Sequence, residues 1–199
     1  MKLDYQIIKN KFIKSKRFQL GLFGTFLLIE ISFYSTHALG VDLIIDNFKS
    51  VTLSMILGYL VGVGVLRFCK NKSDEIMIKA GFKISIFSFA PLFLYAFLFN
   101  INNLEWIIAV CYFVYSIGIA FIVPSLFSIL SREREPHEQG KIYGLIDSTD
   151  TIALLIAIFA GIIYNNLKLN QIAIVLFSFI AIVTSTIFYA KFTKTKKET

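Results

Sequence analysis

The chain has 199 residues, of which 56% are apolar, 16% aromatic and 17% charged. This composition leaves too little polar surface to coat a water-soluble globule, so it excludes an ordinary soluble domain. The formal net charge of +7 comes largely from segments that flank apolar stretches. Such segments typically meet anionic lipid headgroups, so the expected partner is a lipid bilayer and no nucleic acid is needed to explain the charge.

Six apolar stretches follow one another along the chain. Helices of about 18 or more apolar residues can cross roughly 30 Å of hydrocarbon. The stretches that approach or pass this length are 18–39, 51–68, 80–99, 106–130, 143–164 and 171–189. We therefore predict an all-α polytopic membrane protein with three parts: a basic cytoplasmic segment at 1–17, a transmembrane domain of six helices at 18–190, and a basic cytoplasmic tail at 191–199.

Basic residues fall on alternate connections between these stretches. The basic connections hold Arg67, Lys70, Lys72 and Lys79, and then Arg132, Arg134 and Lys141, whereas the others offer only Lys49 and Lys168. Because basic residues near span ends stay in the cytoplasm, both termini are predicted to be cytoplasmic, with the bacterial inner membrane as the expected location. Lysines interrupt the apolar residues of 1–17, so no cleavable signal peptide is predicted.

Small residues recur at every fourth position in two of the stretches. This spacing lets neighbouring helices in lipid approach closely. The two stripes are Ser54, Gly58 and Gly62, and Ala153, Ala157 and Gly161. Each predicts a contact with another helix of one bundle.

The connection between 106–130 and 143–164 carries the most specific pattern. It reads Pro124-Ser125-Leu126-Phe127-Ser128, a charged stretch to Pro136, His137-Glu138-Gln139-Gly140-Lys141, then Gly144 and Ser148, and Ala160-Gly161-Ile162-Ile163-Tyr164. This resembles the joint between the tenth and eleventh helices of the major facilitator superfamily, the twelve-helix secondary transporters. The loop at this point departs from that family, because Leu66 and Phe68 stand where its acidic residue would follow Gly62 or Gly64.

The resemblance places the six predicted helices on the carboxy-terminal half, helices 7 to 12, of that family's fold. It implies secondary active transport of a small solute, with substrate held between two halves near the midplane. The expected partners are that solute, with proton coupling, and a second six-helix half or a second copy of this chain. Two alternatives stay open: an inactive remnant of a transporter gene, and a six-helix substrate-binding subunit of an uptake complex.

Glu30 is the first candidate functional residue, because it lies about twelve residues into the predicted span 18–39 and intramembrane charges cost about 2.5 to 3.5 kcal/mol. Tyr34 and His37 follow on the same helical face. A carboxyl in a medium of low dielectric favours its protonated form. We predict that Glu30, Tyr34, His37 and Tyr115 serve substrate binding or proton coupling, against a purely structural role for Glu30.

Asp147 and Asp150 lie one turn apart near the predicted start of 143–164, where acidic groups meet the positive end of a helix. We predict a role at this helix start, with capping oxygens from Ser148, Thr149 and Thr151; the alternative is a contact in a cytoplasmic gate.

No nucleophile arrangement, phosphate-binding loop or paired histidine motif is present, and Cys69 and Cys111 are too few and too separate for a zinc site. The sequence therefore predicts no enzyme, no metal and no cofactor.

Overall fold

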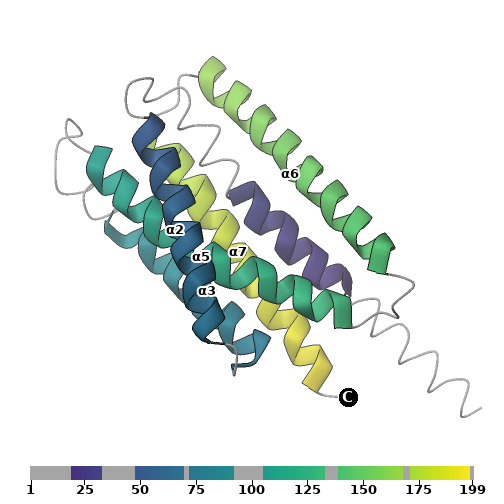
Figure 1. Cartoon of the computed structure of the whole chain (residues 1–199). Coiled ribbons are helices and arrows are strands. Elements are labelled where there is room, and N and C mark those ends of the chain that lie inside the picture. Colours follow the sequence, from purple (N-terminus) through teal and green to yellow (C-terminus); the bar gives the residue numbers. More distant parts are fainter. Residues whose placement is uncertain are drawn as a thin grey trace, which may run out of the picture.

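The computed structural model describes residues 19–32, 48–69, 72–91, 105–132, 139–167 and 171–197, and no strand occurs among them. The helices are Gln19–Ser32, α2 (Phe48–Phe68), α3 (Asp74–Ser88), α5 (Glu105–Arg132), α6 (Gln139–Leu167) and α7 (Gln171–Lys197). Figure 1 shows them as an elongated bundle with α6 at its periphery, alongside Gln19–Ser32 in purple. The predicted all-α class is confirmed for this part of the chain.

Three helical segments are long and apolar enough to cross a membrane: Ala109–Arg132, Tyr143–Ala160 and Leu176–Thr193. Two shorter apolar helices, Gln19–Ser32 and Leu53–Phe68, accompany them. The outward faces of α2 and α6 expose large apolar side chains such as Leu60 and Phe159. Length, composition and this apolar exterior together suggest a membrane protein, because such a surface suits lipid better than water.

Several predicted helix boundaries were wrong. Helix α3 begins at Asp74, not at residue 80. The Ser73 carbonyl oxygen accepts the first hydrogen bonds of this helix from the backbone of Ile76 and Met77, and Asp74 and Glu75 occupy its first turn, where acidic groups favour the positive helix end. The other helix starts and ends also differ: α2 begins at residue 48, α6 begins at 139, and α7 continues to 197 through the predicted tail.

The helix Gln19–Ser32 packs antiparallel to α7. Gly21 lies against the ring of Phe192. Further along this helix, the Ser185 hydroxyl donates to the Thr25 carbonyl oxygen (3.0 Å), and the Ser32 hydroxyl donates to the Ser178 carbonyl oxygen (2.9 Å). Residue numbers thus rise along one helix as they fall along the other. Side-chain hydrogen bonds to backbone carbonyls hold helices together where water is absent.

Helix α5 is the centre of the bundle, with α2 and α3 packed on it. On α2, Gly58 faces the Phe113 carbonyl oxygen, and a Cβ at Gly62 would lie 2.6 Å from that of Ala120. On α3, Gly81 faces Gly118, so the two backbones approach without side chains between them. The glycines of the α2 stripe therefore form the predicted close contact, and their neighbour is α5.

Basic helix ends gather at one end of the bundle. The contact of Gly21 with Phe192 places the start of Gln19–Ser32 beside the end of α7. Asp74, at the start of α3, pairs with Arg132 at the end of α5. Figure 1 shows α6 beginning at the same end of the molecule. Successive connections therefore lie at alternate ends of the bundle, in the same order as the basic and non-basic connections of the sequence.

Candidate functional site

Glu30 lies near the carboxy-terminal end of the described helix Gln19–Ser32 and is only 9% exposed. Its side chain forms a hydrogen bond with that of Asp150, on α6. Two carboxyl groups can share a hydrogen bond only when one of them carries a proton, because an ionised carboxylate has no donor. The structure therefore brings two acidic residues of different helices together, and we call them the carboxyl pair.

Tyrosine side chains from two further helices contribute to the electrostatic surroundings of Glu30. Tyr59 of α2 and Tyr115 of α5 both lie close enough to interact electrostatically with Glu30. The ring of Tyr115 packs edge to face with Tyr112, with ring centroids 6.5 Å apart. Four helices thus contribute to the site: Gln19–Ser32, α2, α5 and α6.

A short chain of hydrogen bonds holds the Tyr115 hydroxyl in place. The Tyr115 hydroxyl donates to the Ser32 hydroxyl oxygen at 2.9 Å, and the Ser32 hydroxyl donates to the Ser178 carbonyl oxygen at 2.9 Å. The chain links α5, Gln19–Ser32 and α7 through fully buried side chains. Elsewhere in the described interior, four hydroxyls are buried without a hydrogen-bond partner, those of Ser116, Ser125, Ser178 and Tyr189.

The structure brings together some of the predicted site residues. Glu30 and Tyr115 lie within electrostatic range of each other, whereas Tyr34 and His37 lie outside the described residues. Asp150 joins Glu30, but Asp147 is exposed. The roles of Tyr59 and Ser32 were not predictable from local sequence, since the electrostatic interaction of Tyr59 with Glu30 and the hydrogen bond of Ser32 with Tyr115 depend on how distant helices pack.

The predicted placement of Asp147 and Asp150 at a helix start was wrong. Helix α6 begins at Gln139 and has no acidic residue in its first turn, so both lie more than two turns inside it. The neighbouring hydroxyls do not cap the helix either. Ser148, Thr149 and Thr151 donate to carbonyl oxygens one turn earlier in the same helix, at 2.7, 2.7 and 2.9 Å.

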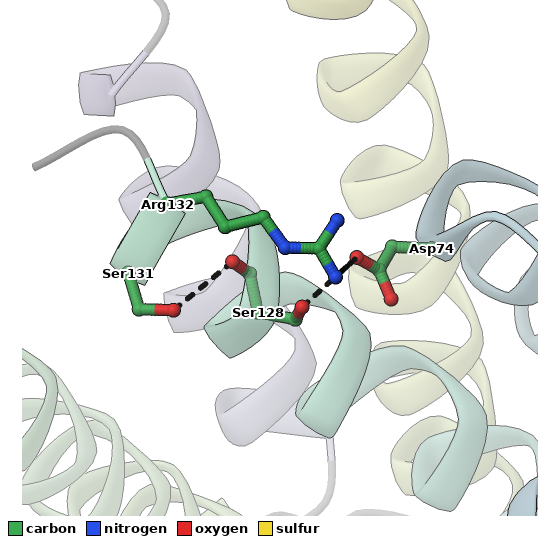
Figure 2. A network of polar contacts seen from close by, with 4 residues as sticks. All are labelled: Asp74, Ser128, Ser131 and Arg132. Atoms are coloured by element: carbon green, nitrogen blue, oxygen red, sulfur yellow. Dashed lines mark hydrogen bonds and ion pairs between the residues drawn. The ribbon is translucent and has the colours of Figure 1, made fainter. Parts of the chain in front are cut away.

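A second polar cluster lies at the basic end of the bundle (Figure 2). The Arg132 Nη2 atom is 3.2 Å from Asp74 Oδ2, which also accepts a hydrogen bond from the Ser128 hydroxyl at 2.9 Å. The Ser131 hydroxyl donates to the Ser128 carbonyl oxygen at 3.0 Å. The cluster ties the start of α3 to the end of α5. Asp74, in the first turn of α3, thus supplies an acidic partner for Arg132.

No group of three or more His, Cys, Asp and Glu side chains that could hold a metal ion occurs within the described ranges. Cys111 is buried and Cys69 is half-buried, and neither forms a disulfide within the described part of the chain.

Comparison with known proteins adds no identification, because no family model, curated protein or solved structure matches this chain. The resemblance to the major facilitator superfamily therefore stays a prediction from residues 124–164.

Proposed function

We propose that the chain is a proton-coupled half-transporter for a small solute. It works as six membrane-crossing helices with a second six-helix half or a second copy of itself. The observation that carries this proposal is the carboxyl pair formed by Glu30 and Asp150 inside an apolar helical bundle. Ionisable groups at such a position are costly, and where proteins keep them they commonly serve ion or proton pathways.

The distribution of charge supports cytoplasmic termini. The end of the bundle where Arg132 pairs with Asp74 also holds the end of α7 with its lysines. Basic helix ends remain on the cytoplasmic side of a membrane. In this orientation Gln19–Ser32 and α6 both run from the cytoplasm outward, and the carboxyl pair lies well inside the hydrocarbon layer.

The chemistry of the carboxyl pair suits the coupling of proton movement to solute transport. A pair that holds one proton can release it to one side of the membrane, and it can then take one up from the other side. Tyr59 offers a hydroxyl group that can donate to a solute or to an ionised carboxylate, whereas the Tyr115 hydroxyl already donates to Ser32. Rocking of this half against its partner would expose the pair alternately to the two sides.

Solute-driven proton movement in inverted membrane vesicles tests this proposal. Vesicles from cells that express the full chain are acidified by respiration and followed with a fluorescent dye that reports the pH gradient. Drugs, metabolites and lipophilic cations are then added in turn. We expect at least one class to dissipate the gradient, Glu30→Gln to abolish this response, and Glu75→Gln, an acid-to-amide change in α3, to retain it. The proposal fails if no solute responds, or if Glu30→Gln leaves the response and its pH dependence unchanged.

A further inference from the structure

We propose that copies of this chain join through α6 of one copy and α3 of the next, with Asp147 of α6 paired to Lys83 of α3 across the contact. This inference rests on the proposed function, which needs a second half or a second copy, and it names the surfaces that bring two copies together. Its evidence is a polar face on α6, a basic face on α3 and the similar depth of their charged side chains.

The outward face of α6 is polar where a membrane-crossing helix is expected to be apolar. Gly144, Asp147, Ser148 and Thr151 fall on one side of the helix because they recur at helical spacing, and all four are exposed. They lie within Tyr143–Ala160, which is long and apolar enough to cross a membrane. An acidic side chain that faces lipid at such a position is costly, so this face requires a polar partner.

The hydrogen bonds of this face define the chemistry of that partner. The Ser148 hydroxyl donates to the Gly144 carbonyl oxygen at 2.7 Å, and the Thr151 hydroxyl donates to the Asp147 carbonyl oxygen at 2.9 Å. Because these protons are bound within the helix, the two hydroxyl oxygens and the Asp147 carboxylate offer only acceptors to a neighbour. The partner must therefore bring donors, and a lysine ammonium group has three donors and no acceptor.

The outward face of α3 carries such donors. Its opposite side packs against α5 at Gly81, so the side chains that face away from the bundle are free to meet another molecule. Exposed side chains recur along this outward side, and two of them are basic. They are Ile76, Lys79, Lys83 and Phe87.

Lys83 and Asp147 lie at similar depths in the bundle. Helices α3 and α6 both begin at its basic end (Figure 1). Lys83 lies nine residues after Asp74, and Asp147 lies eight residues after Gln139. At a rise of 1.5 Å per residue, each is roughly 12 to 14 Å along its helix. Copies in one membrane share one orientation, so α3 and α6 of neighbouring copies run parallel and Lys83 meets Asp147.

The two faces also complement each other in shape. A side-chain atom at Gly140 or Gly144 would meet open space, so the face of α6 is smooth there, whereas Lys79 and Lys83 form a ridge of long side chains on α3. A ridge on one helix packs into a groove on another. Figure 1 shows α3 and α6 on different sides of the bundle, so the contact is head to tail and joins two unlike faces.

Cross-linking of two distinguishable copies tests this contact. In full chains with Cys69 and Cys111 replaced by alanine, one tagged form carries Gly140→Cys at the start of α6, and a differently tagged form carries Ile76→Cys at the start of α3. Both are reconstituted in lipid vesicles at a low protein-to-lipid ratio and treated with a short bifunctional maleimide. We expect dimers that carry both tags. Few should form when Val65→Cys, an exposed position near the same end of α2, replaces Ile76→Cys.

Exchange of charge between the copies identifies the ion pair. Asp147→Lys in the copy labelled on α6, or Lys83→Asp in the copy labelled on α3, should lower the yield of mixed dimers about tenfold or more, because like charges opposed across an interface are costly. The two changes together should restore the yield. Each change placed in the other copy lies away from the labelled contact and should leave the yield unaltered, which shows that the variant folds.

The contact is refuted if mixed dimers do not form, if Val65→Cys yields as many, if the combined exchange fails to restore them, or if each change acts equally in either copy. Cross-linking needs no solute. Mixed dimers of a chain that moves no protons would therefore reject the proposed function alone, whereas solute-driven proton movement without mixed dimers would reject this contact alone.

Discussion

At the scale of single residues, the Tyr115 hydroxyl shows how a buried polar group is satisfied in this bundle. It donates a hydrogen bond to Ser32 on another helix, and the Ser32 hydroxyl donates in turn to a backbone carbonyl oxygen of α7. The two members of this chain are not equivalent. Tyr115 depends on Ser32 as its acceptor, whereas Ser32 keeps its bond to Ser178 when Tyr115 is removed.

This asymmetry predicts unequal costs for two small substitutions. Tyr115→Phe removes one interhelical hydrogen bond and should lower the free energy of unfolding by about 0.5 to 1 kcal/mol. Ser32→Ala removes two and leaves the Tyr115 hydroxyl buried without an acceptor, so it should cost about 1 to 3 kcal/mol. Equilibrium unfolding in detergent micelles on addition of sodium dodecyl sulfate measures both. Equal costs would contradict the observed direction of the hydrogen bonds.

The sequence predicted the importance of Glu30 but not its partner. An isolated acid well inside an apolar stretch is visible from its position alone. Its contact with Asp150 requires that Gln19–Ser32 and α6 lie side by side, which no local pattern specifies. Asp150 was also predicted to lie near the start of a helix. A carboxyl group at that position interacts favourably with the positive helix end, so no partner on another helix was needed to explain it. The error in the boundary of α6 therefore concealed the pair.

At the scale of elements, the helices were predictable and their ends were not. Helix α5 agrees with its prediction to within two residues at each end because its apolar stretch and its helix coincide. Helix α3 begins with Asp74-Glu75 and so extends beyond its apolar stretch. Hydropathy marks where a helix can lie in lipid, whereas backbone capping and charged first turns decide where it begins. The Ser73-Asp74-Glu75 sequence was the signal that could have placed this start.

The contact between α3 and α5 yields a prediction with an internal control. A Cβ at Gly118 would collide with the Ser85 hydroxyl and lie 2.7 Å from the Gly81 carbonyl oxygen, whereas a Cβ at Gly64 meets nothing within 4 Å. Gly118→Ala should therefore lower the free energy of unfolding by about 1 to 3 kcal/mol through overpacking. Gly64→Ala should remain within about 0.5 kcal/mol of the unmodified chain. The same unfolding assay compares them, and equal effects would mean that α3 and α5 do not pack through these glycines.

At the scale of the whole molecule, the sequence predicts membrane crossing more readily than helix arrangement. The number of apolar stretches and the order of basic connections are local properties, and the clustering of basic helix ends agrees with them. The choice of α5 as the central helix depends on glycines of α2 and α3 meeting its backbone at Phe113 and Gly118. That complementarity involves surfaces distant in sequence, so no single stretch reveals it.

Whether the chain crosses the membrane an even or an odd number of times can be tested by locating its two termini. Six spans place both termini on one side of the membrane, whereas crossing by only the three segments Ala109–Arg132, Tyr143–Ala160 and Leu176–Thr193 would place them on opposite sides. In a background without Cys69 and Cys111, we expect Lys9→Cys, Gly140→Cys and Lys197→Cys to react with a membrane-impermeant maleimide from the cytoplasmic side, and Lys49→Cys from the other side. Sealed vesicles of both orientations provide the measurement. Reaction of Lys9→Cys on the side opposite to Lys197→Cys would reject six spans, and with them the match to half of a twelve-helix transporter.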